Sequence, residues 1–358
     1  MNIGIVGGGQ LARMLALAGY PLGLCFTFLD PAPDACAAPL GTHLQGEYDD
    51  EEMLKQLAAS SDVVTYEFEN VPESAVIYLS EHTTVHPGAE ALAVARDRLR
   101  EKSLFRELGL DTPAFLPVDS LVELQQAVSE IGLPAVLKTR TLGYDGKGQA
   151  VLREPGDVAT VWEQLGGVPL ILEGFVTFDR EISVIAVRRA SGEVRFYPVA
   201  ENTHRDGILS VSRCRSADAM QPQAEQYVRS VLESLDYVGV LTLELFQAGD
   251  RLLVNEMAPR VHNSGHWTIE GAAVSQFENH LRAILDLPLG ETRAVAHAAM
   301  VNFIGTMPAS AEVVSLVDVH LHDYGKLPRP GRKLGHATVV AADERGLDVS
   351  IEALLSLR

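Results

Sequence analysis

Strands and helices alternate over the first hundred residues, and this alternation constrains the fold more than any other feature of the chain. The apolar runs NIGIVG, LCFTFLD and DVVTYEF are typical of buried strands, and they are followed in turn by the helix-like stretches QLARMLALAGY, DDEEMLKQLAAS and PESAVIYLSE. The second stretch has acidic residues in its first turn, and the third begins at a proline. The sequence therefore predicts a parallel α/β domain at the start of the chain.

Beyond about residue 112 the chain becomes richer in strands. Helices are predicted at SLVELQQAVSEI, DVATVWEQL and AEQYVRSVLESL. The apolar runs that predict strands are LPAVLKT, QAVLRE, PLILEGF, EISVIAVRR, VRFYPVAEN, GILSVSRCR and the hairpin-like VGVLTLELFQAGDRLLVNEM. The last portion, from AAMVNFIG to ATVVAADE, predicts short strands around the basic loop YGKLPRPGRKLGH. No internal repeat or low-complexity linker is present, so the domains are expected to share one compact body.

Composition excludes several classes of function. The formal net charge of the 358 residues is −19, and a nucleic-acid-binding protein would instead need clustered Lys and Arg. No run of apolar residues is long enough for a membrane helix, and MNIGIV lacks the basic start of a signal peptide, so we expect a cytoplasmic protein. Cys25, Cys36 and Cys214 have no metal-ligand spacing and are expected to be reduced thiols.

A glycine turn follows the first predicted strand and opens the first predicted helix. Gly7, Gly9 and Ala12 fit the fingerprint of a dinucleotide-binding turn, and Asp30 ends the next strand, where a ribose-binding acid is expected. This turn alone favours an NAD-dependent oxidoreductase. The alternative is a tight strand-to-helix turn that binds no cofactor.

A second glycine-rich stretch points to phosphate. Lys138 ends the apolar run PAVLK, and GYDGKGQ follows over residues 143–149. Three glycines let a hairpin tip bring backbone N–H groups close to phosphate oxygens, while Lys138 and Lys147 supply positive charge. The order of residues is not that of a Walker loop. A glycine hairpin without a ligand is the alternative, and the lysine at the strand end favours a nucleotide.

Carboxylates occur where buried strands should have none. Glu244 and Glu256 lie one on each arm of the apolar hairpin, and two carboxylates together with phosphate oxygens suit Mg²⁺. Side chains alternate along a strand, so both acids face the same way only if the connection has an odd number of residues, such as a three-residue loop containing Gly249. A two-residue Gly-Asp turn would separate them.

Polar residues crowd the end of this hairpin in NEMAPRVHNSGH, residues 255–266. Buried polar groups without hydrogen-bond partners cost several kcal/mol each, so a ligand or metal is expected there. Earlier in the chain, EGFV at residues 173–176 could offer backbone groups to a base, and Glu181 could accept ribose hydroxyls. A solvated strand end is the alternative reading of those acids.

Four of these motifs together carry a resemblance to a known family. GYDGKGQ, EGFV with Glu181, ENTHRDGIL and NEMAPRVHNSGHWT resemble the 5-(carboxyamino)imidazole ribonucleotide synthases of the ATP-grasp superfamily, and the similarity extends from GGGQLARM to GRKLGH. The resemblance implies an α/β and α+β fold. Residues 1–100 would form a Rossmann-like pre-ATP-grasp domain that binds no dinucleotide, and residues 101–295 the ATP-grasp domain, with a small lobe at about 112–175 and a large lobe at about 176–295. Residues 296–358 would form a small β-rich domain.

The resemblance also assigns site residues. The ATP site would consist of Arg98, Lys138, Gly143, Tyr144, Asp145, Gly146, Lys147, Gly148, Gln149, Glu173, Gly174, Phe175, Val176, Glu181, His204, Asn255 and Glu256. Magnesium would bind Glu244 and Glu256. The catalytic residues would be Arg260, His262 and Asn263 around bicarbonate, with Tyr144 and Asp145 over the imidazole. The ribonucleotide would contact Gly8, Gly9, Gln10, Lys326, Arg332 and Lys333.

The chain departs from the family pattern at two positions near the predicted metal site. Many ATP-grasp proteins have an asparagine ligand two positions after the second glutamate, where this chain has Ala258. Val261 stands where proline is more typical, which should perturb the backbone modestly.

The implied activity is the ATP- and bicarbonate-dependent carboxylation of 5-aminoimidazole ribonucleotide in purine biosynthesis, by a homodimer that requires ATP and Mg²⁺ and no nucleic-acid or membrane partner. A related ATP-grasp ligase that uses formate or another carboxylate is the closest alternative. The NAD-dependent oxidoreductase is a more distant one, and a nucleotide-binding scaffold without catalysis would have no use for both Glu244 and Glu256.

Overall fold

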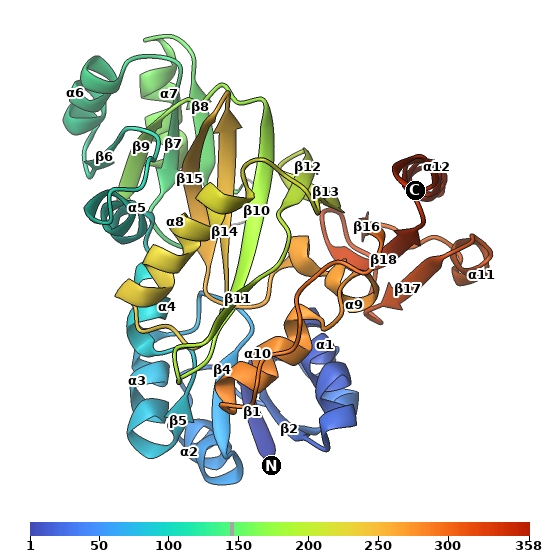
Figure 1. Ribbon diagram of the computed structural model, residues 1–358. Helices are drawn as coiled ribbons and strands as arrows, with labels where there is room; N and C mark the ends of the chain where they lie inside the picture. Colours follow the sequence, from blue (N-terminus) through green and yellow to red (C-terminus); the bar gives the residue numbers. More distant parts are fainter. Residues whose placement is uncertain (144–146) are drawn as a thin grey trace.

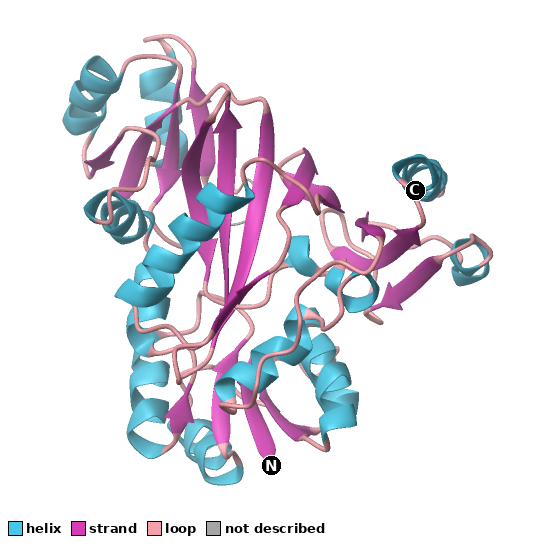
Figure 2. Ribbon diagram, in the orientation of Figure 1, coloured by secondary structure: helices cyan, strands magenta, loops and turns pink. Residues whose placement is uncertain are grey.

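The computed structural model describes residues 1–143 and 147–358, which form three sheets with helices packed around them (Figure 1). The N-terminal sheet lies at the bottom of the view and a small four-stranded sheet at the top. A nine-stranded sheet runs between them and out to the C-terminal helices. Figure 2 shows the long central strands of this large sheet, with helices on its flanks.

The N-terminal sheet is parallel throughout its five strands, in the order β3-β2-β1-β4-β5, which confirms the predicted parallel α/β unit. Its strands are β1 (Asn2–Val6), β2 (Cys25–Leu29), β3 (Thr42–Leu44), β4 (Val63–Tyr66) and β5 (Thr84–Val85), and its helices are α1 (Gln10–Gly19), α2 (Glu51–Ser60), α3 (Glu73–His82) and α4 (Ala89–Ala95). Asp50 caps α2 by accepting the N–H groups of Glu52 and Met53, which is why the acidic run before MLKQL starts a helix.

The four-stranded sheet is antiparallel and has the order β6-β9-β7-β8. It contains β6 (Phe115–Val118), β7 (Ala135–Thr139), β8 (Gln149–Leu152) and β9 (Leu170–Gly174), with α6 (Leu121–Ile131) and α7 (Asp157–Leu165) packed on it and α5 (Arg98–Glu107) leading into it. Ser120 caps α6 through the N–H of Glu123, and the Glu123 carboxylate accepts the N–H of Asp119 in return.

The large sheet has the order β15-β14-β10-β12-β13-β16-β18-β17, with β11 paired to β10. Its strands are β10 (Arg180–Arg188), β11 (Val194–Phe196), β12 (Ala200–Arg205), β13 (Ile208–Cys214), β14 (Gly239–Ala248), β15 (Arg251–Ala258), β16 (His297–Ile304), β17 (Val319–Asp323) and β18 (Lys333–Ala341). The helices on it are α8 (Gln221–Ser234), α9 (Thr268–Gly271), α10 (Gln276–Ile284), α11 (Ser310–Val314) and α12 (Glu344–Ser356).

The C-terminal strands do not form a sheet of their own. β16 pairs with β13, so the last three strands continue the large sheet, and α12 covers them. The strand pattern of the sequence had predicted the strands here but not α12, and it had also passed over α4, α5 and α10. The signal was present in two of them, because α10 has Phe277, Leu281 and Ile284 and α12 has Leu347, Ile351 and Leu354 at helical spacing.

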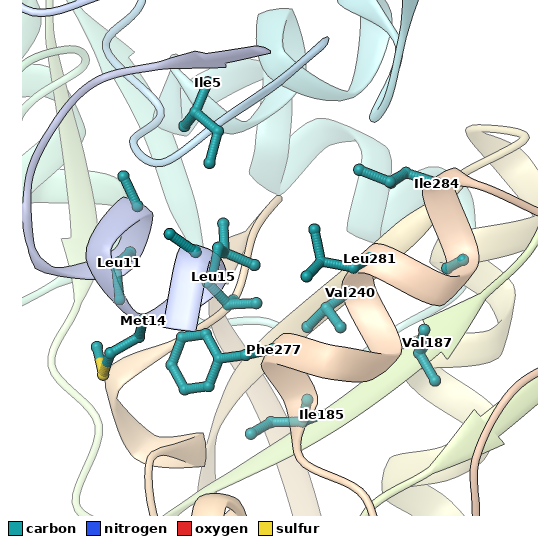
Figure 3. Packing of buried hydrophobic residues seen from close by; sticks show 14 of the residues in the cluster. Ile5, Leu11, Met14, Leu15, Ile185, Val187, Val240, Phe277, Leu281 and Ile284 are labelled. Carbon is teal, nitrogen blue, oxygen red and sulfur yellow. The ribbon is translucent and has the colours of Figure 1, made fainter. Parts of the chain in front are cut away.

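One hydrophobic cluster joins the N-terminal sheet to the large sheet. Leu11 and Leu15 of α1 pack with Phe277 and Leu281 of α10, which in turn rests on Val240 of β14 (Figure 3). Leu15 and Leu281 are fully buried. Because this core is continuous, the two sheets are expected to hold a fixed relation to each other.

Among the helices of residues 1–143 and 147–358, none combines the length and the apolar character needed to cross a membrane.

Candidate active site

A large cleft, with a volume of about 760 Å³, lies where the three sheets meet. Its walls come from the loop after β4, from β7 and β9 of the small sheet, from β14 and β15 of the large sheet, and from the start of β18. The predicted site residues that line it are Gln10, Arg98, Lys138, Gly143, Gln149, Glu173, Gly174, Phe175, Val176, Glu181, His204, Glu244, Asn255, Glu256, Arg260, His262, Asn263 and Lys333. The remaining predicted residues that the structure describes, Gly8, Gly9, Lys147, Gly148, Lys326 and Arg332, lie outside this lining.

Glu244 and Glu256 are directly opposite each other on the hairpin, but not for the reason predicted from the sequence. The connection is the two-residue turn that was expected to separate the two acids, because Ala248 pairs with Arg251. Leu245 pairs with Val254, so an uninterrupted ladder would set Asn255 opposite Glu244. A β-bulge adds one residue to β15 at this point and brings Glu256 opposite Glu244 instead. The bulge therefore places both carboxylates on the same face of the hairpin, which the two-residue turn alone would not do.

The two acids repel each other and respond differently to that repulsion. Burial favours the neutral form of Glu244, but the hydrogen bond and charge of His262, whose Nε2 lies 3.1 Å from Glu244 Oε1, lower its pKa to about 2. Burial and the charge of Glu244 raise the pKa of Glu256 above its ordinary value. Arg98 approaches Glu256 at 3.8 Å and offsets only part of this.

This pair fits a divalent cation that also binds phosphate oxygens. Mg²⁺ is held in proteins by one or two carboxylates together with waters and substrate phosphates. Among residues 1–143 and 147–358, no group of three or more His, Cys, Asp or Glu side chains could hold a metal ion. Ala258 stands where many ATP-grasp proteins have an asparagine ligand. It is buried opposite Thr242 on the hairpin and has no side-chain atom that could bind a metal.

Two residues of α5 that the sequence reasoning missed contact the backbone of the hairpin, and one of them, Glu101, also lines the cleft. Glu101 is 2% exposed, and its Oε1 accepts the backbone N–H of Met257 at 2.6 Å. Lys102 is 1% exposed and donates to the carbonyl of Asn255 at 2.6 Å. Burial and the charge of Glu256 raise the pKa of Glu101 to about 8. These residues lie three and four positions after Arg98 on one helix, and that spacing was the signal available in the sequence.

Glu173 lies between two lysines at the end of β9. Its Oε2 is 3.0 Å from Lys138 Nζ and 3.4 Å from Lys102 Nζ. Burial raises the pKa of Glu173, but the two ammonium charges outweigh this and lower it to about 2. Its other oxygen, Oε1, is buried and has no hydrogen-bond partner among the described residues. An ionised, partly unsatisfied acceptor is therefore present at the predicted base-binding strand end.

The backbone N–H groups that follow Glu173 already donate hydrogen bonds within the protein. The N–H groups of Gly174 and Phe175 donate to the carbonyls of Ala114 and Pro134, at 2.8 and 3.2 Å. Beyond them, His204 Nδ1 lies 2.7 Å from Glu181 Oε2. Burial lowers the pKa of His204, but the hydrogen bond and charge of Glu181 raise it by more. The net pKa therefore lies above the ordinary value.

The glycine-rich stretch follows β7 and precedes β8, and its two end residues, Gly143 and Gln149, line the cleft. Tyr144, Asp145 and Gly146 lie outside the described residues. Arg98 donates to the carbonyl of Gly143 at 3.4 Å and to that of Thr139 at 3.2 Å, and a Cβ at position 143 would lie 2.7 Å from the Arg98 guanidinium. Glycine is therefore required there if Arg98 is to hold the loop.

The far end of the cleft contains the predicted anion-binding residues. Arg260 Nε donates to Glu69 Oε2 at 2.7 Å. His262 Nδ1 lies 2.8 Å from the hydroxyl of Ser264, which leaves its Nε2 directed at Glu244. Asn263 exchanges hydrogen bonds with the side chain of Asn302 on β16. Arg260 and His262 thus stand on the same cleft wall as the acid pair.

The N-terminal glycine turn is satisfied by acids of its own domain. Gly8 N–H donates to Asp30 Oδ2 at 2.7 Å, and Glu67 accepts the N–H groups of Gly9 and Ala12 at the start of α1. Asp30 also accepts the hydroxyl of Tyr48 at 3.1 Å. Asp30 therefore holds the turn together, which removes the basis for reading it as the ribose-binding acid of an NAD site.

The basic loop reaches this turn from the other end of the chain. Lys326 Nζ donates to Gln10 Oε1, and burial lowers the pKa of Lys326 although the charge of Glu67 opposes the change. Arg332 donates to the carbonyl of Leu327 within the loop at 3.1 Å. Glu67 and Glu69, which line the cleft, were missed; their position just after a strand of a parallel sheet was the available signal.

Comparison with known families accounts for nearly the whole chain. Residues 1–96 match the ribonucleotide synthetase preATP-grasp domain, residues 103–277 the ATP-grasp domain, and residues 298–348 the phosphoribosylaminoimidazole carboxylase C-terminal domain. The fold and the cleft are those of an ATP-grasp enzyme with a preceding Rossmann-like domain and a small C-terminal β-rich domain.

Individual relatives narrow this class. The chain is 58% identical to the N5-carboxyaminoimidazole ribonucleotide synthase of Pseudomonas aeruginosa, over 100% of this chain and 99% of that protein. The solved structure of N5-carboxyaminoimidazole ribonucleotide synthetase from Thermus thermophilus matches with a TM-score of 0.95 and 54% identity, over 99% and 98% of the two chains. The Aspergillus clavatus synthase in complex with ADP and 5-aminoimidazole ribonucleotide matches with a TM-score of 0.93 and 31% identity, over 99% and 98%. The chain belongs to the family of N5-carboxyaminoimidazole ribonucleotide synthases.

Proposed function

We propose that the chain is an ATP-dependent carbon-nitrogen ligase that carboxylates the exocyclic amine of 5-aminoimidazole ribonucleotide with bicarbonate, releasing ADP and phosphate, in purine biosynthesis. The observation that carries the proposal is the cleft in which Glu244 and Glu256 face each other beside Arg260 and His262. Such a cleft can hold a nucleotide triphosphate at one end and a small anion at the other. Family membership supplies the reaction that this arrangement supports.

ATP is proposed to lie along the small-sheet side of the cleft. The free oxygen of Glu173 and the strand end through Val176 would meet the adenine, and Glu181 with His204 would meet the ribose. Arg98 and Lys138 would meet the phosphates, together with the glycine-rich loop from Gly143 to Gln149. Lys138 would then leave its ion pair with Glu173 and bind a phosphate oxygen, while Lys102 continues to neutralise Glu173.

Magnesium is proposed to bind Glu244 and Glu256, with phosphate oxygens completing its coordination. The bound ion would neutralise charge on the phosphoryl group during its transfer. Cation binding would also relieve the repulsion that raises the pKa of Glu256.

Arg260, His262 and Asn263 are proposed to hold bicarbonate next to the γ-phosphate. A bicarbonate oxygen attacks the γ-phosphorus, ADP leaves, and carboxyphosphate forms. The amine nitrogen of the ribonucleotide then forms a bond to the carboxyl carbon, and the carbon–oxygen bond to phosphate breaks. The amine loses a proton in this step, and the products are the carbamate and phosphate. The cleft must exclude water, because water would hydrolyse carboxyphosphate.

The ribonucleotide is proposed to lie against Gly8, Gly9 and Gln10, with Lys326, Arg332 and Lys333 around its 5′-phosphate. The contact between Lys326 and Gln10 supports this, because it joins the basic loop to the glycine turn. Tyr144 and Asp145 are proposed to cover the imidazole, although they lie outside the described residues.

We also propose the division of the chain into a Rossmann-like domain at 1–100, an ATP-grasp domain at 101–295 with lobes at about 112–175 and 176–295, and a C-terminal domain at 296–358. A homodimer located in the cytoplasm is proposed from family membership.

Phosphate release tests the proposed function most directly. Purified protein is assayed with ATP, bicarbonate and 5-aminoimidazole ribonucleotide, and each is omitted in turn. Phosphate release that requires all three is expected. If formate replaced bicarbonate without loss of rate, the enzyme would be a ligase for a different carboxylate.

A further inference from the structure

The bulge in β15 is held by two side chains of α5, Glu101 and Lys102, neither of which was assigned a contact with the metal. Lys102 Nζ donates to the carbonyls of Asn255 at 2.6 Å and Val254 at 3.3 Å. Glu101 Oε1 accepts the N–H of Met257 at 2.6 Å. These bonds attach to the backbone on both sides of Glu256, so α5 holds the strand immediately before and immediately after this acid.

The bulge decides which side chain of β15 stands opposite Glu244. Side chains alternate along a strand, so without the extra residue Asn255 would stand opposite Glu244, and Glu256 would point to the other side of the hairpin. A bulge also interrupts the ladder and leaves backbone groups without their usual partners. In this hairpin Lys102 and Glu101 form bonds to the backbone at that interruption.

Both side chains are buried where they meet the backbone of β15. Lys102 is 1% exposed and Glu101 is 2% exposed, so neither is a surface charge. A buried ammonium group needs a nearby counter-charge, and Glu173 provides it at 3.4 Å. The backbone bonds are thus made in a dry environment, where a lost partner would be left unsatisfied.

We propose that Glu101 and Lys102 are positioning residues for the metal, because they hold the β15 bulge and so keep Glu256 on the same face as Glu244. The inference rests on the proposed function in one respect, which is that it takes this acid pair as the Mg²⁺ site. Neither residue needs to touch the metal or a substrate. Their loss should weaken metal binding far more than nucleotide binding.

Manganese binding tests this without any turnover. Mn²⁺ is titrated into enzyme saturated with ADP, and free Mn²⁺ is followed by electron paramagnetic resonance. Glu101→Met removes the acceptor for Met257 N–H, and Glu101→Gln retains an oxygen at the same reach. Lys102→Met keeps most of the apolar stem and removes the donor. Lys55→Met makes the same chemical change at an exposed position of α2 and serves as the control.

We expect Glu101→Met and Lys102→Met to weaken Mn²⁺ binding at least tenfold, while Glu101→Gln and Lys55→Met stay within threefold of wild type. ADP affinity measured in EDTA should change less than threefold in both Glu101 variants and in Lys55→Met, which a general loss of structure would not produce. Lys102→Met is left out of this comparison, because Lys102 also pairs with Glu173 of the proposed nucleotide site. Wild-type Mn²⁺ affinity in a folded Glu101→Met protein would overturn the inference, and this variant decides the matter even if Lys102→Met does not fold. Failure of the proposed function would instead appear as wild-type protein that releases no phosphate with the three substrates.

Discussion

At the scale of single residues, the site is defined by charges that the protein leaves only partly compensated. Glu256 has a raised pKa because it lies in a desolvated wall opposite the ionised Glu244. Glu173 keeps one buried oxygen without a partner among the described residues. Residues that serve folding alone seldom face a second carboxylate or keep an unsatisfied buried oxygen, since both conditions are costly. Both acids therefore indicate places where a ligand supplies what the protein lacks.

Glu256→Gln is expected to lower phosphate release at least a hundredfold while leaving the protein folded. The amide has nearly the same shape but no charge for the cation, and it removes the repulsion from Glu244, so the free energy of unfolding should not fall. Steady-state phosphate release and thermal unfolding measure the two effects. Glu163→Gln, at an exposed position of α7, is the control. A variant that turned over near the wild-type rate at limiting magnesium would show that Glu256 does not bind the metal.

At the scale of elements, the connection between β17 and β18 and the packing of α10 bring distant parts of the chain together. The basic loop would be a solvated turn if it were isolated. In the fold it lies against the start of α1, because Lys326 bonds to Gln10. Helix α10 lies between α1 and β14, and its apolar face is shared by two sheets.

Replacing both Lys326 and Arg332 with Ala is expected to weaken ribonucleotide binding by at least ~2 kcal/mol, the scale of lost charge-assisted contacts. ATP binding should remain nearly unchanged, because neither residue lines the ATP side of the cleft. Calorimetric titration with each ligand measures this. Lys55 and Arg100, both exposed, give a control double variant with the same loss of charge. Native affinity of the double variant for the ribonucleotide would show that the loop is a surface turn and does not bind the 5′-phosphate.

Leu281→Ala is expected to lower the free energy of unfolding by about 2–5 kcal/mol, as for other leucines removed from close-packed cores. Leu281 is fully buried between α1 and β14, so its loss opens a cavity at the junction of two sheets. Urea unfolding measures the change. Leu287→Ala, just after the same helix at 41% exposure, should cost far less. Equal effects would mean that the junction is not tightly packed.

At the scale of the whole molecule, one buried neutral histidine, His280, links the N-terminal sheet to the large sheet. His280 on α10 accepts the N–H of Val240 through Nδ1 at 3.1 Å and contacts the hydroxyl of Thr65 through Nε2 at 3.0 Å. Its Nδ1 must therefore be unprotonated. Burial lowers the pKa of His280 to about 3 and those of His266 and His336 well below their ordinary value.

Stability should consequently fall as the pH falls below about 6.5, the ordinary pKa of histidine. Unfolded His280 takes up a proton there while folded His280 does not, so its contribution is fully present above that pKa and declines by about 1.4 kcal/mol per pH unit below it. Urea unfolding at pH 7.5 and pH 5.5 measures the decline. His280→Gln should be less stable at pH 7.5 and should lose less on acidification, whereas His82→Gln, at an exposed position, should behave as wild type. An unchanged pH dependence in His280→Gln would contradict this assignment.

The sequence by itself determined the class of the fold and predicted many of the polar residues that line the cleft. The parallel N-terminal sheet followed from alternating apolar runs, because strand and helix periods are local properties. The motifs around Glu173, Glu244 and Arg260 were readable because polar side chains at strand ends need partners wherever they occur.

Only the tertiary structure decided how these residues meet. Turn length alone could not give the register of the hairpin. The two-residue turn would have separated Glu244 from Glu256, and the bulge that brings them together is bonded to Glu101 and Lys102 on another element. In the same way, Glu67 rather than a ligand holds the start of α1, and Lys326 reaches Gln10 from more than three hundred residues away. Contacts of this kind depend on which surfaces the packed sheets bring together, and no local pattern in the chain encodes them.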